Sequence, residues 1–199
     1  MENFWDKRYN TNEYVYGREP NAYFKSKLDQ LNPGSLLLPG EGEGRNAVYG
    51  ASIGWQVHAF DSSVVGREKA KQLAWENGTT IHYDIATYQE YDPRSLRFNA
   101  VGLLFTHQPP EMRPGFHRKM IEALEPGGII ILEGFHKDQI YRDSGGPGNL
   151  GYLFSEEELK DDFSRLEIIE LNTLVRNLDE GSFHQGEAAV VQLTARKSG

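Results

Sequence analysis

The sequence predicts an α/β protein in which strands and helices alternate along the chain. Two short, uniformly apolar runs at residues 36–38 and 129–132 have the length of strands that are buried on both faces. Segments with apolar residues at helical spacing lie between such runs. A turn with three alternating glycines joins the first run to a predicted helix. Together these features predict a mostly parallel sheet with helices on both faces.

The elements of the first two thirds follow from apolar periodicity and from the residues that end each run. Residues 1–31 are predicted to form a helical, aromatic-rich cap segment, with helical turns at 5–9 and at 20–31. Residues 35–199 are predicted to form the core of the same single domain. Strands are expected at residues 36–38, 56–60, 79–83, 98–105 and 129–133, and helices at residues 46–53, 64–77 and 111–124.

The last third is predicted as a loop, a helix and a hairpin. Residues 134–154 are glycine-rich, and loops of that length in compact domains are usually functional lids or disordered. Ser155 and Glu158 have the spacing of a capping box, which predicts a helix through residue 163. Strands at 166–175 and 188–196 are separated by a polar segment without helical spacing. We therefore expect them to pair antiparallel at the edge of the sheet.

Composition limits the partners of the chain. A net charge of −8 over 199 residues disfavours nucleic acid as the main partner. No apolar run is long enough to span a membrane, and the first residues lack the basic and apolar parts of a secretory signal. The absence of cysteine excludes disulfides, thiolate metal ligands and a cysteine nucleophile. We expect a cytoplasmic protein without a metal site, a monomer or homodimer that acts on a small molecule.

The glycine turn after the first strand is the strongest functional motif. Gly40, Gly42 and Gly44 alternate there, which lets the backbone turn tightly and approach a ligand closely. A glycine loop between a buried strand and a helix N-terminus is typical of nucleotide-cofactor sites. Read from Gly40 the motif is GxGxG, the form seen with S-adenosylmethionine. Read from Gly42 it also satisfies the dinucleotide fingerprint GxGxxG/A, so both cofactors are candidates.

The charge of the loop favours the first cofactor. Glu41 and Glu43 lie where a dinucleotide would place its pyrophosphate, and two carboxylates there would repel it. S-adenosylmethionine carries a sulfonium cation and an amine, with no phosphate, so acidic residues near it are tolerated or helpful. Arg45 offsets part of this negative charge. Asn46, at the start of the predicted helix, is included in the same predicted site.

Polar residues at the ends of the next strands extend the predicted site. Asp61 follows the second strand, where an acid can accept two hydrogen bonds from the ribose hydroxyls of a cofactor. The alternative is a helix N-cap, although Ser62 or Ser63 can serve as the cap instead. Asp84 follows the third strand and can accept from an exocyclic amine, with the Ile85 amide beside it.

The end of the fourth strand supplies a possible catalytic residue. The carboxyl ends of the strands form the active-site rim in open α/β sheets. Thr106 and His107 follow the fourth strand directly, so both are expected at this rim. We include Ser62 and Thr106 in the predicted cofactor site and name His107 as the candidate general base.

The order of elements and several motifs resemble the class I S-adenosylmethionine-dependent methyltransferases over nearly the whole chain. The small tellurite-resistance and thiopurine type is the most similar group. The matching features are the glycine loop at 40–44, Asp61, Asp84, the Leu-Glu-Pro-Gly-Gly sequence at 124–128, the Phe-Trp-Asp-Lys-Arg-Tyr sequence at 4–9 with Val-Tyr-Gly at 15–17, Gly-Arg-Asn at 44–46, and Leu-Glu-Gly-Phe at 132–135.

This resemblance implies a Rossmann-like three-layer sandwich whose seven-stranded sheet is mostly parallel, with the last strand antiparallel. It also implies that S-adenosyl-L-methionine places its methionine part at residues 40–44, its ribose at Asp61 and its adenine at Asp84 and Ile85. One position departs from the family pattern. Leu38 stands where an acid commonly binds the cofactor amine, so Glu41 or a backbone carbonyl is expected to replace it.

The predicted function is methyl transfer from S-adenosylmethionine to a small molecule, including soft sulfur, selenium or tellurium nucleophiles that need little base assistance. The alternatives are an NAD(P)-dependent oxidoreductase and a non-catalytic S-adenosylmethionine-binding module. No sequence feature identifies the methyl acceptor.

Overall fold

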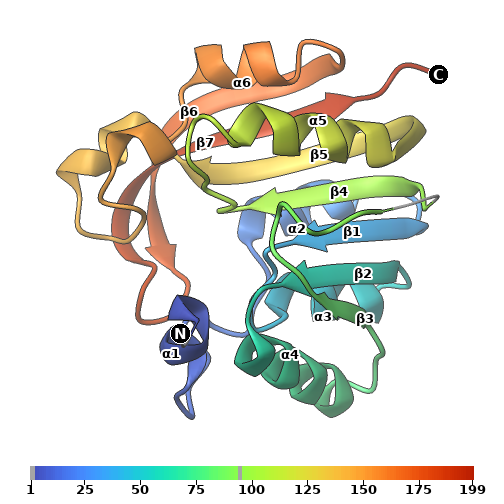
Figure 1. The fold of residues 1–199 in the computed structure, drawn as a ribbon, viewed down its shortest axis with the longest axis vertical. Helices are drawn as coiled ribbons and strands as arrows, with labels where there is room; N and C mark the ends of the chain where they lie inside the picture. Colours follow the sequence, from blue (N-terminus) through green and yellow to red (C-terminus); the bar gives the residue numbers. More distant parts are fainter. Residues whose placement is uncertain (1–2, 94–95) are drawn as a thin grey trace.

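A computed structural model describes residues 3–93 and 96–199, so Met1 and Glu2 of the predicted cap segment lie outside the described residues. Seven strands form one sheet in the order β3-β2-β1-β4-β5-β7-β6 (Figure 1). The strands are β1 (Ser35–Pro39), β2 (Gln56–Asp61), β3 (His82–Ile85), β4 (Phe98–Leu104), β5 (Leu124–Phe135), β6 (Glu167–Asp179) and β7 (Gln185–Arg196). The helices are α1 (Phe4–Tyr9), α2 (Ala22–Leu28), α3 (Arg45–Ser52), α4 (Val64–Glu76), α5 (Arg113–Ala123) and α6 (Glu156–Asp162).

The pairing pattern confirms the predicted α/β class. Strands β1 to β5 pair in parallel, while β7 lies between β5 and β6 and is antiparallel to both. The last strand is thus inserted into the sheet, and the hairpin of β6 and β7 forms its edge as expected. The fold is the Rossmann-like arrangement with an antiparallel last strand.

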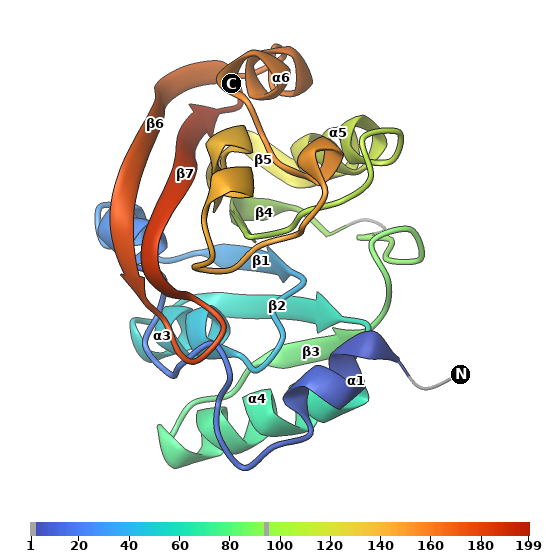
Figure 2. The same ribbon diagram turned by 90° about the vertical axis from the view of Figure 1, so that its left-hand side faces the viewer.

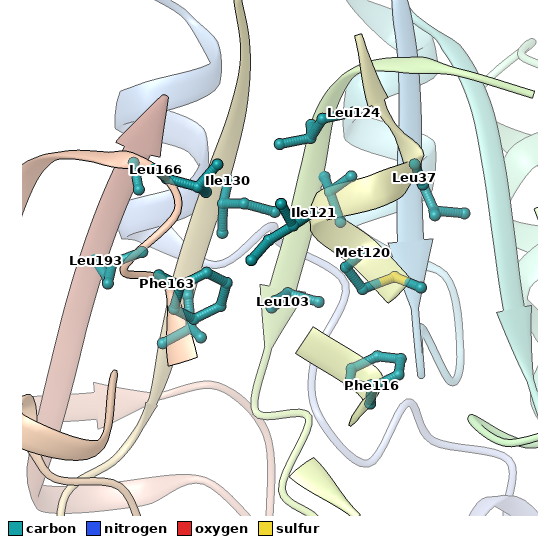
Figure 3. Close-up of a cluster of buried hydrophobic side chains, with 14 of the residues drawn as sticks. Leu37, Leu103, Phe116, Met120, Ile121, Leu124, Ile130, Phe163, Leu166 and Leu193 are labelled. Carbon is teal, nitrogen blue, oxygen red and sulfur yellow. The ribbon is translucent and has the colours of Figure 1, made fainter. Parts of the chain in front are cut away.

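Alternate residues of the central strands enter two separate cores, one on each face of the sheet. In β1, Leu37 belongs to the core that contains side chains of α5 and α6, whereas Leu36 and Leu38 belong to the core that contains side chains of α2 and α3. Figure 3 shows the first of these cores, where Met120 and Ile121 of α5 point toward the sheet. Burial on both faces explains why the central strands are short, uniformly apolar runs in the sequence.

Several element boundaries differ from the predicted ones. Strand β6 continues to Asp179 and β7 begins at Gln185, so most of the polar segment predicted between them belongs to the hairpin. Side chains of β6 alternate between partly buried and exposed positions, and this strand therefore has no apolar run to mark its end. Strand β3 begins later than expected and continues through Ile85.

The segment predicted as a long loop at 134–154 is more ordered than its composition indicates. Strand β5 extends to Phe135, and two 3-10 turns follow, η1 (Lys137–Tyr141) and η2 (Leu150–Tyr152). His136 and Phe154 form an isolated parallel bridge, which brings the two ends of the segment together. The predicted capping box is confirmed, because Ser155 and Glu158 bond reciprocally at the start of α6.

Three segments that are distant in sequence gather at the carboxyl ends of the parallel strands. These are α1, the segment from η1 to η2, and the turn between β6 and β7 (Figure 1). Figure 2 looks onto this end of the molecule, with α1 and the hairpin turn toward the viewer. Within the described residues, none of the helices has both the length and the apolar composition needed to cross a bilayer.

Candidate active site

A cavity of about 680 Å³ opens at this end of the sheet. Its walls come from α1 and the segment after it, the glycine loop, the ends of β2 to β5, residues 145–147, and the β6–β7 turn. Aromatic side chains line much of it: Phe4, Trp5, Tyr9, Tyr16, Phe60, Tyr88, Phe105, Phe135, Tyr152 and Phe183. A cavity of this size and lining is typical of sites for small organic ligands.

The glycine loop has backbone angles that favour glycine at all three positions. Gly40, Gly42 and Gly44 have φ values of +62°, +60° and +91°. A Cβ atom at Gly40 would lie 2.2 Å from the hydroxyl oxygen of Tyr88, and one at Gly42 would lie 2.5 Å from that of Tyr9. The loop therefore needs glycine because aromatic side chains pack against it, and the backbone angles add to the requirement.

Glu41 caps the helix that follows the loop. Gly44 is the N-cap residue of α3 and has no side chain, so it makes no capping bond. The Glu41 carboxylate takes this place, since its Oε1 accepts from the Ala47 N–H at 2.7 Å and its Oε2 accepts from Asn46 Nδ2 at 3.3 Å. Burial raises the pKa of Glu41 to about 7. Glu41 and Asn46 both line the cavity, as predicted, whereas Leu38 is buried in the core.

Asp61 also faces the cavity and holds the glycine loop in place. Its Oδ2 accepts from the Gly42 N–H at 3.1 Å, and its Oδ1 accepts from the Ser63 N–H at 2.8 Å. The Ser62 backbone N–H also interacts with this carboxylate, so about one of its roughly four acceptor positions remains for a ligand. Burial raises the pKa of Asp61 to about 6. Ser63, rather than Asp61, is the N-cap of α4, because its Oγ accepts from the Gly66 N–H at 2.9 Å.

Asp84 and Ile85, predicted to hold adenine, do not line the cavity. Strand β3 runs through both residues, and the Asp84 carboxylate lies 3.3 Å from Nε2 of exposed His82. The predicted end of the strand is therefore too early. Ala86 and Thr87, which follow the true end of β3, line the cavity instead.

The remaining predicted positions divide between the cavity wall and the layer behind it. Ser62 lines the cavity, and its carbonyl oxygen accepts from Asn3 Nδ2 at 2.7 Å. Thr106 is fully buried, does not line the cavity, and has an Oγ1 atom without a partner among the described residues. Gly42 and Gly44 shape the loop from behind without lining the cavity.

His107 lines the cavity but cannot act as the predicted base. Both ring nitrogens are engaged: Nδ1 lies 2.8 Å from the Tyr152 carbonyl oxygen, and Nε2 accepts from the Phe135 N–H at 3.0 Å. This pattern requires the neutral ring with its proton on Nδ1. Burial lowers the pKa of His107 to about 4, in agreement with that state. His107 is a structural link between β5 and η2.

The N-terminal segment is fastened over the cavity by polar contacts to the loop and to α4. Glu43 Oε2 accepts from the Val15 N–H at 2.8 Å, and its other oxygen pairs with Lys69. Arg45 Nη1 donates to the Tyr16 carbonyl oxygen at 3.1 Å, and its Nη2 binds Glu180 at 2.7 Å. Three aromatic side chains of this segment, Trp5, Tyr9 and Tyr16, line the cavity.

Some cavity residues were not predicted from the sequence. Arg8, Phe105, Phe183 and His184 come from three separate parts of the chain and meet only in the folded protein. Phe105 has a φ of +54° directly after β4, an unusual value that no local motif indicates. The sequence offered one signal for His184, which is its position in the polar segment between the last two predicted strands.

A family model described as tellurite resistance protein TehB matches residues 1–193. The chain belongs to the TehB family. The match covers the glycine loop, the aromatic N-terminal segment and the β6–β7 turn, which are the parts that form the cavity.

Two curated proteins and one solved structure are similar to this TehB family chain. A 2-heptyl-1-hydroxyquinolin-4(1H)-one methyltransferase of Mycobacteroides abscessus is 30% identical over 66% of this chain and 58% of its own length. A probable S-adenosyl-L-methionine-dependent methyltransferase TehB of Haemophilus influenzae is 26% identical over 86% of this chain and 57% of its own length. The chain thus spans a little over half of these relatives. The crystal structure of TehB from Haemophilus influenzae has a TM-score of 0.72 at 20% identity, covering 98% of this chain and 66% of that one.

Proposed function

We propose that the chain binds S-adenosylmethionine and transfers its methyl group to a small-molecule acceptor in the same cavity. The observation that carries this proposal is the position of Glu41. Its carboxylate accepts from the Ala47 N–H at the N-terminus of α3, and Glu41 is part of the cavity wall. A ligand with a protonated amine or a sulfonium group gains from such a carboxylate, and a phosphate does not.

The same observation disfavours the dinucleotide alternative. A dinucleotide places its pyrophosphate at the N-terminus of the helix after the glycine loop. Here the Glu41 carboxylate already occupies that anion-binding position. The nearby guanidinium of Arg45 is engaged by Glu180 and the Tyr16 carbonyl oxygen, so it is not free to neutralise a pyrophosphate.

The residues present fit S-adenosylmethionine along the loop side of the cavity. Asp61 retains an acceptor position for a ribose hydroxyl, and Glu41 lines the cavity beside the loop, where the amine is proposed to bind. Trp5 and Tyr9, stacked with ring centroids 5.7 Å apart, present aromatic surface that suits a planar base or a cation. When bound, the cofactor supplies an activated methyl group, and these residues position it for in-line attack.

The acceptor is proposed as a small molecule because a cavity of about 680 Å³ suits a small organic ligand and the chain carries a net charge of −8. The name of the matching family keeps soft tellurium, selenium and sulfur nucleophiles among the candidates. The name of the mycobacterial relative adds a hydroxylated heterocycle. A monomer or homodimer in the cytoplasm remains the expected state.

Ligand-dependent stability distinguishes the cofactors. A ligand at a hundred times its dissociation constant stabilises the folded state by about 2.7 kcal/mol. For a chain of this size the melting temperature should rise by roughly 5–10 °C. We expect this shift with S-adenosylmethionine and S-adenosylhomocysteine and none with NAD or NADP. A shift with a dinucleotide alone would contradict the proposal.

A further inference from the structure

The part of the cavity next to the β6–β7 turn is lined mainly by rings that surround His184. The ring centroid of His184 lies 4.4 Å from that of Phe105, 4.6 Å from that of Tyr16 and 5.2 Å from that of Phe135. Phe183 and Tyr152 line the cavity as well. A flat, apolar ligand can stack or pack edge-on against such walls. His184 is the polar group at their centre.

The two nitrogens of His184 have different surroundings. Nδ1 is buried, makes no hydrogen bond to any described residue, and lies 3.7 Å from Oε2 of Glu180. This distance is longer than a hydrogen bond, but it places a carboxylate directly behind the ring. Nε2 is not among the buried unpartnered atoms of the described residues, and His184 lines the cavity, so Nε2 is the nitrogen that a ligand can reach.

The carboxylate behind the ring is held rigidly. Glu180 accepts from Arg45 Nη2 at 2.7 Å and from Arg176 Nη2 on the other oxygen. The nearby His184 ring, Arg45 and Arg176 together hold the pKa of Glu180 well below its ordinary value, against the effect of burial. Glu180 is therefore ionised, and the Nδ1 proton of a neutral His184 faces a fixed negative charge.

His184 itself is a neutral base at physiological pH. Burial lowers its pKa below the ordinary value; Glu180 opposes this, while Arg45 and Arg176 reinforce it. The titratable and charged groups that face it are Glu180 and Arg176 of the hairpin, Arg45 of α3, Tyr16 of the N-terminal segment and His107 after β4. An unprotonated imidazole with a carboxylate behind it has the arrangement that general-base catalysis requires.

We propose that His184, oriented by Glu180, is the general base that deprotonates a hydroxylated aromatic acceptor bound among these rings. This inference rests on the methyl-transfer function proposed above. The acceptor O–H bond breaks as its proton moves to Nε2. The oxygen forms a bond to the methyl carbon, and the carbon–sulfur bond breaks with its electron pair left on sulfur. The imidazolium, stabilised by Glu180, later returns the proton to solvent.

The acceptor class follows from the combination of ring walls and a base. A nucleophile that is already ionised would not need His184, since it attacks without losing a proton. An aromatic hydroxyl titrates near pH 10 and is about 99% protonated near pH 8, so a base in reach accelerates its reaction by about 100-fold or more. Glu180 acts through His184 and is a positioning residue.

The test compares two phenols that differ in acidity and have similar shape. At about pH 8, 4-nitrophenol is largely ionised, whereas 4-methylphenol is protonated. We expect His184→Gln to lose about 100-fold in kcat/KM with 4-methylphenol and less than tenfold with 4-nitrophenol. With 4-methylphenol, the rate of the variant should also rise about tenfold per pH unit, because only the ionised fraction reacts. The matched control is His82→Gln, on exposed β3, which should equal the wild type with both phenols.

Three results would overturn the assignment. They are an equal loss with both phenols, which indicates a structural role; no loss with 4-methylphenol; and no turnover of either phenol by the wild-type chain. Titration of S-adenosylhomocysteine into wild type and His184→Gln separates these from failure of the proposed function. Intact cofactor binding with either of the first two results rejects the base assignment alone. The third result rejects the base assignment alone when the wild type methylates another acceptor, and it rejects the proposed methyl transfer when no acceptor is methylated. Absent binding to the wild type rejects the cofactor proposal.

Discussion

Asp61 has two roles that the sequence presented as alternatives. It lines the cavity, where a ribose could bind, and it also accepts the N–H groups of Gly42 and Ser63. A single buried carboxylate therefore links the conformation of the glycine loop to ligand binding. Substitution should consequently change both stability and affinity.

We expect Asp61→Ala to weaken S-adenosylhomocysteine binding by tenfold or more. It removes charge-assisted hydrogen bonds worth about 1.5–3 kcal/mol each and leaves two backbone N–H groups unpaired, which costs about 1–3 kcal/mol of stability. Asp61→Asn should lose less affinity than Asp61→Ala, since the amide oxygen of asparagine remains as one acceptor. Calorimetric titration and urea denaturation measure the two effects.

Ser63→Ala is the matched control for these variants. It removes the acceptor of the Gly66 N–H at the start of α4 and should cost about 1 kcal/mol of stability without changing affinity. If Asp61→Ala behaves like Ser63→Ala, with affinity retained, the ribose is not bound at Asp61.

The raised pKa values of Glu41 and Asp61 predict a pH-dependent affinity. Burial brings these values to about 7 and about 6 in the free protein. A cationic amine at Glu41 and ribose hydroxyls at Asp61 both favour the ionised carboxylates, so affinity is close to full at about pH 8, one unit above the higher value. The affinity is lost as the pH falls through the pKa values of Glu41 and Asp61. At one pH unit below the pKa of either group, that group alone should lower the affinity by about tenfold. Titrations of S-adenosylhomocysteine between about pH 5.5 and 8 measure this, and Glu41→Gln should flatten the upper part of the curve. An affinity that rises on acidification would contradict the assignment.

At the scale of elements, the glycine loop depends on its contact with the N-terminal segment. A Cβ at Gly42 would meet the Tyr9 hydroxyl at 2.5 Å, in a backbone conformation with φ of +60°. We expect Gly42→Ala to destabilise the protein by more than the roughly 1 kcal/mol that the backbone angle alone costs, and to weaken cofactor binding by displacing Glu41.

Gly78→Ala isolates the backbone contribution. Gly78 has a φ of +66°, and a Cβ added there would have no heavy atom within 4 Å, so only the angle changes the stability. Adding Tyr9→Phe to Gly42→Ala should recover part of the lost stability, because it removes the hydroxyl oxygen that the new Cβ atom would contact. Equal destabilisation by Gly42→Ala and Gly78→Ala in thermal unfolding would show that the contact with Tyr9 has no effect.

The elements differ in how much their sequences indicate. The central strands and the Ser155 capping motif were predictable, since strands buried on both faces are apolar runs and the capping box has a fixed spacing. The ends of β3 and β6 were not, because their side chains are largely exposed and carry no apolar pattern. The misplaced end of β3 is why Asp84 and Ile85, rather than Ala86 and Thr87, were expected at the cavity.

The site was predictable where one short motif forms it. The glycine loop, Glu41 and Asp61 lie within 22 residues of sequence and were found. His107 was correctly expected at the strand ends, but its hydrogen bonds to Tyr152 and Phe135 depend on tertiary contacts. His184 reaches the cavity only because β7 is inserted beside β5, which brings the hairpin turn over the site.

At the scale of the whole molecule, Glu133 joins the N-terminal segment, the central sheet and the hairpin. This fully buried carboxylate of β5 accepts from Asn21 Nδ2 and from Arg176 Nη2, each at 2.6 Å, and from Gln192 Nε2. Asn21 is also the N-cap of α2. A buried network in which the central carboxylate has three donors fixes the relative positions of the elements around the cavity.

We expect Glu133→Ala to cost about 3 kcal/mol or more of stability, because it leaves buried polar partners unsatisfied. Glu167→Ala is the matched control on the same sheet, where the carboxylate is exposed and 4.0 Å from Arg196. It should change stability by less than about 0.5 kcal/mol. Urea denaturation measures the stability of both variants. Similar midpoints would mean that the network does not stabilise the assembly of these elements.

The most direct test of the account is a single-turnover reaction with methyl-labelled S-adenosylmethionine and excess protein. The acceptors are thiols, selenite, tellurite, small amines and phenols, and mass spectrometry follows both products. The account predicts that at least one acceptor gains the labelled methyl group while an equal amount of S-adenosylhomocysteine forms, and that Asp61→Ala slows this reaction at limiting cofactor. Bound S-adenosylmethionine that remains unchanged with every acceptor would indicate a binding module, and would contradict the assignment of methyl transfer.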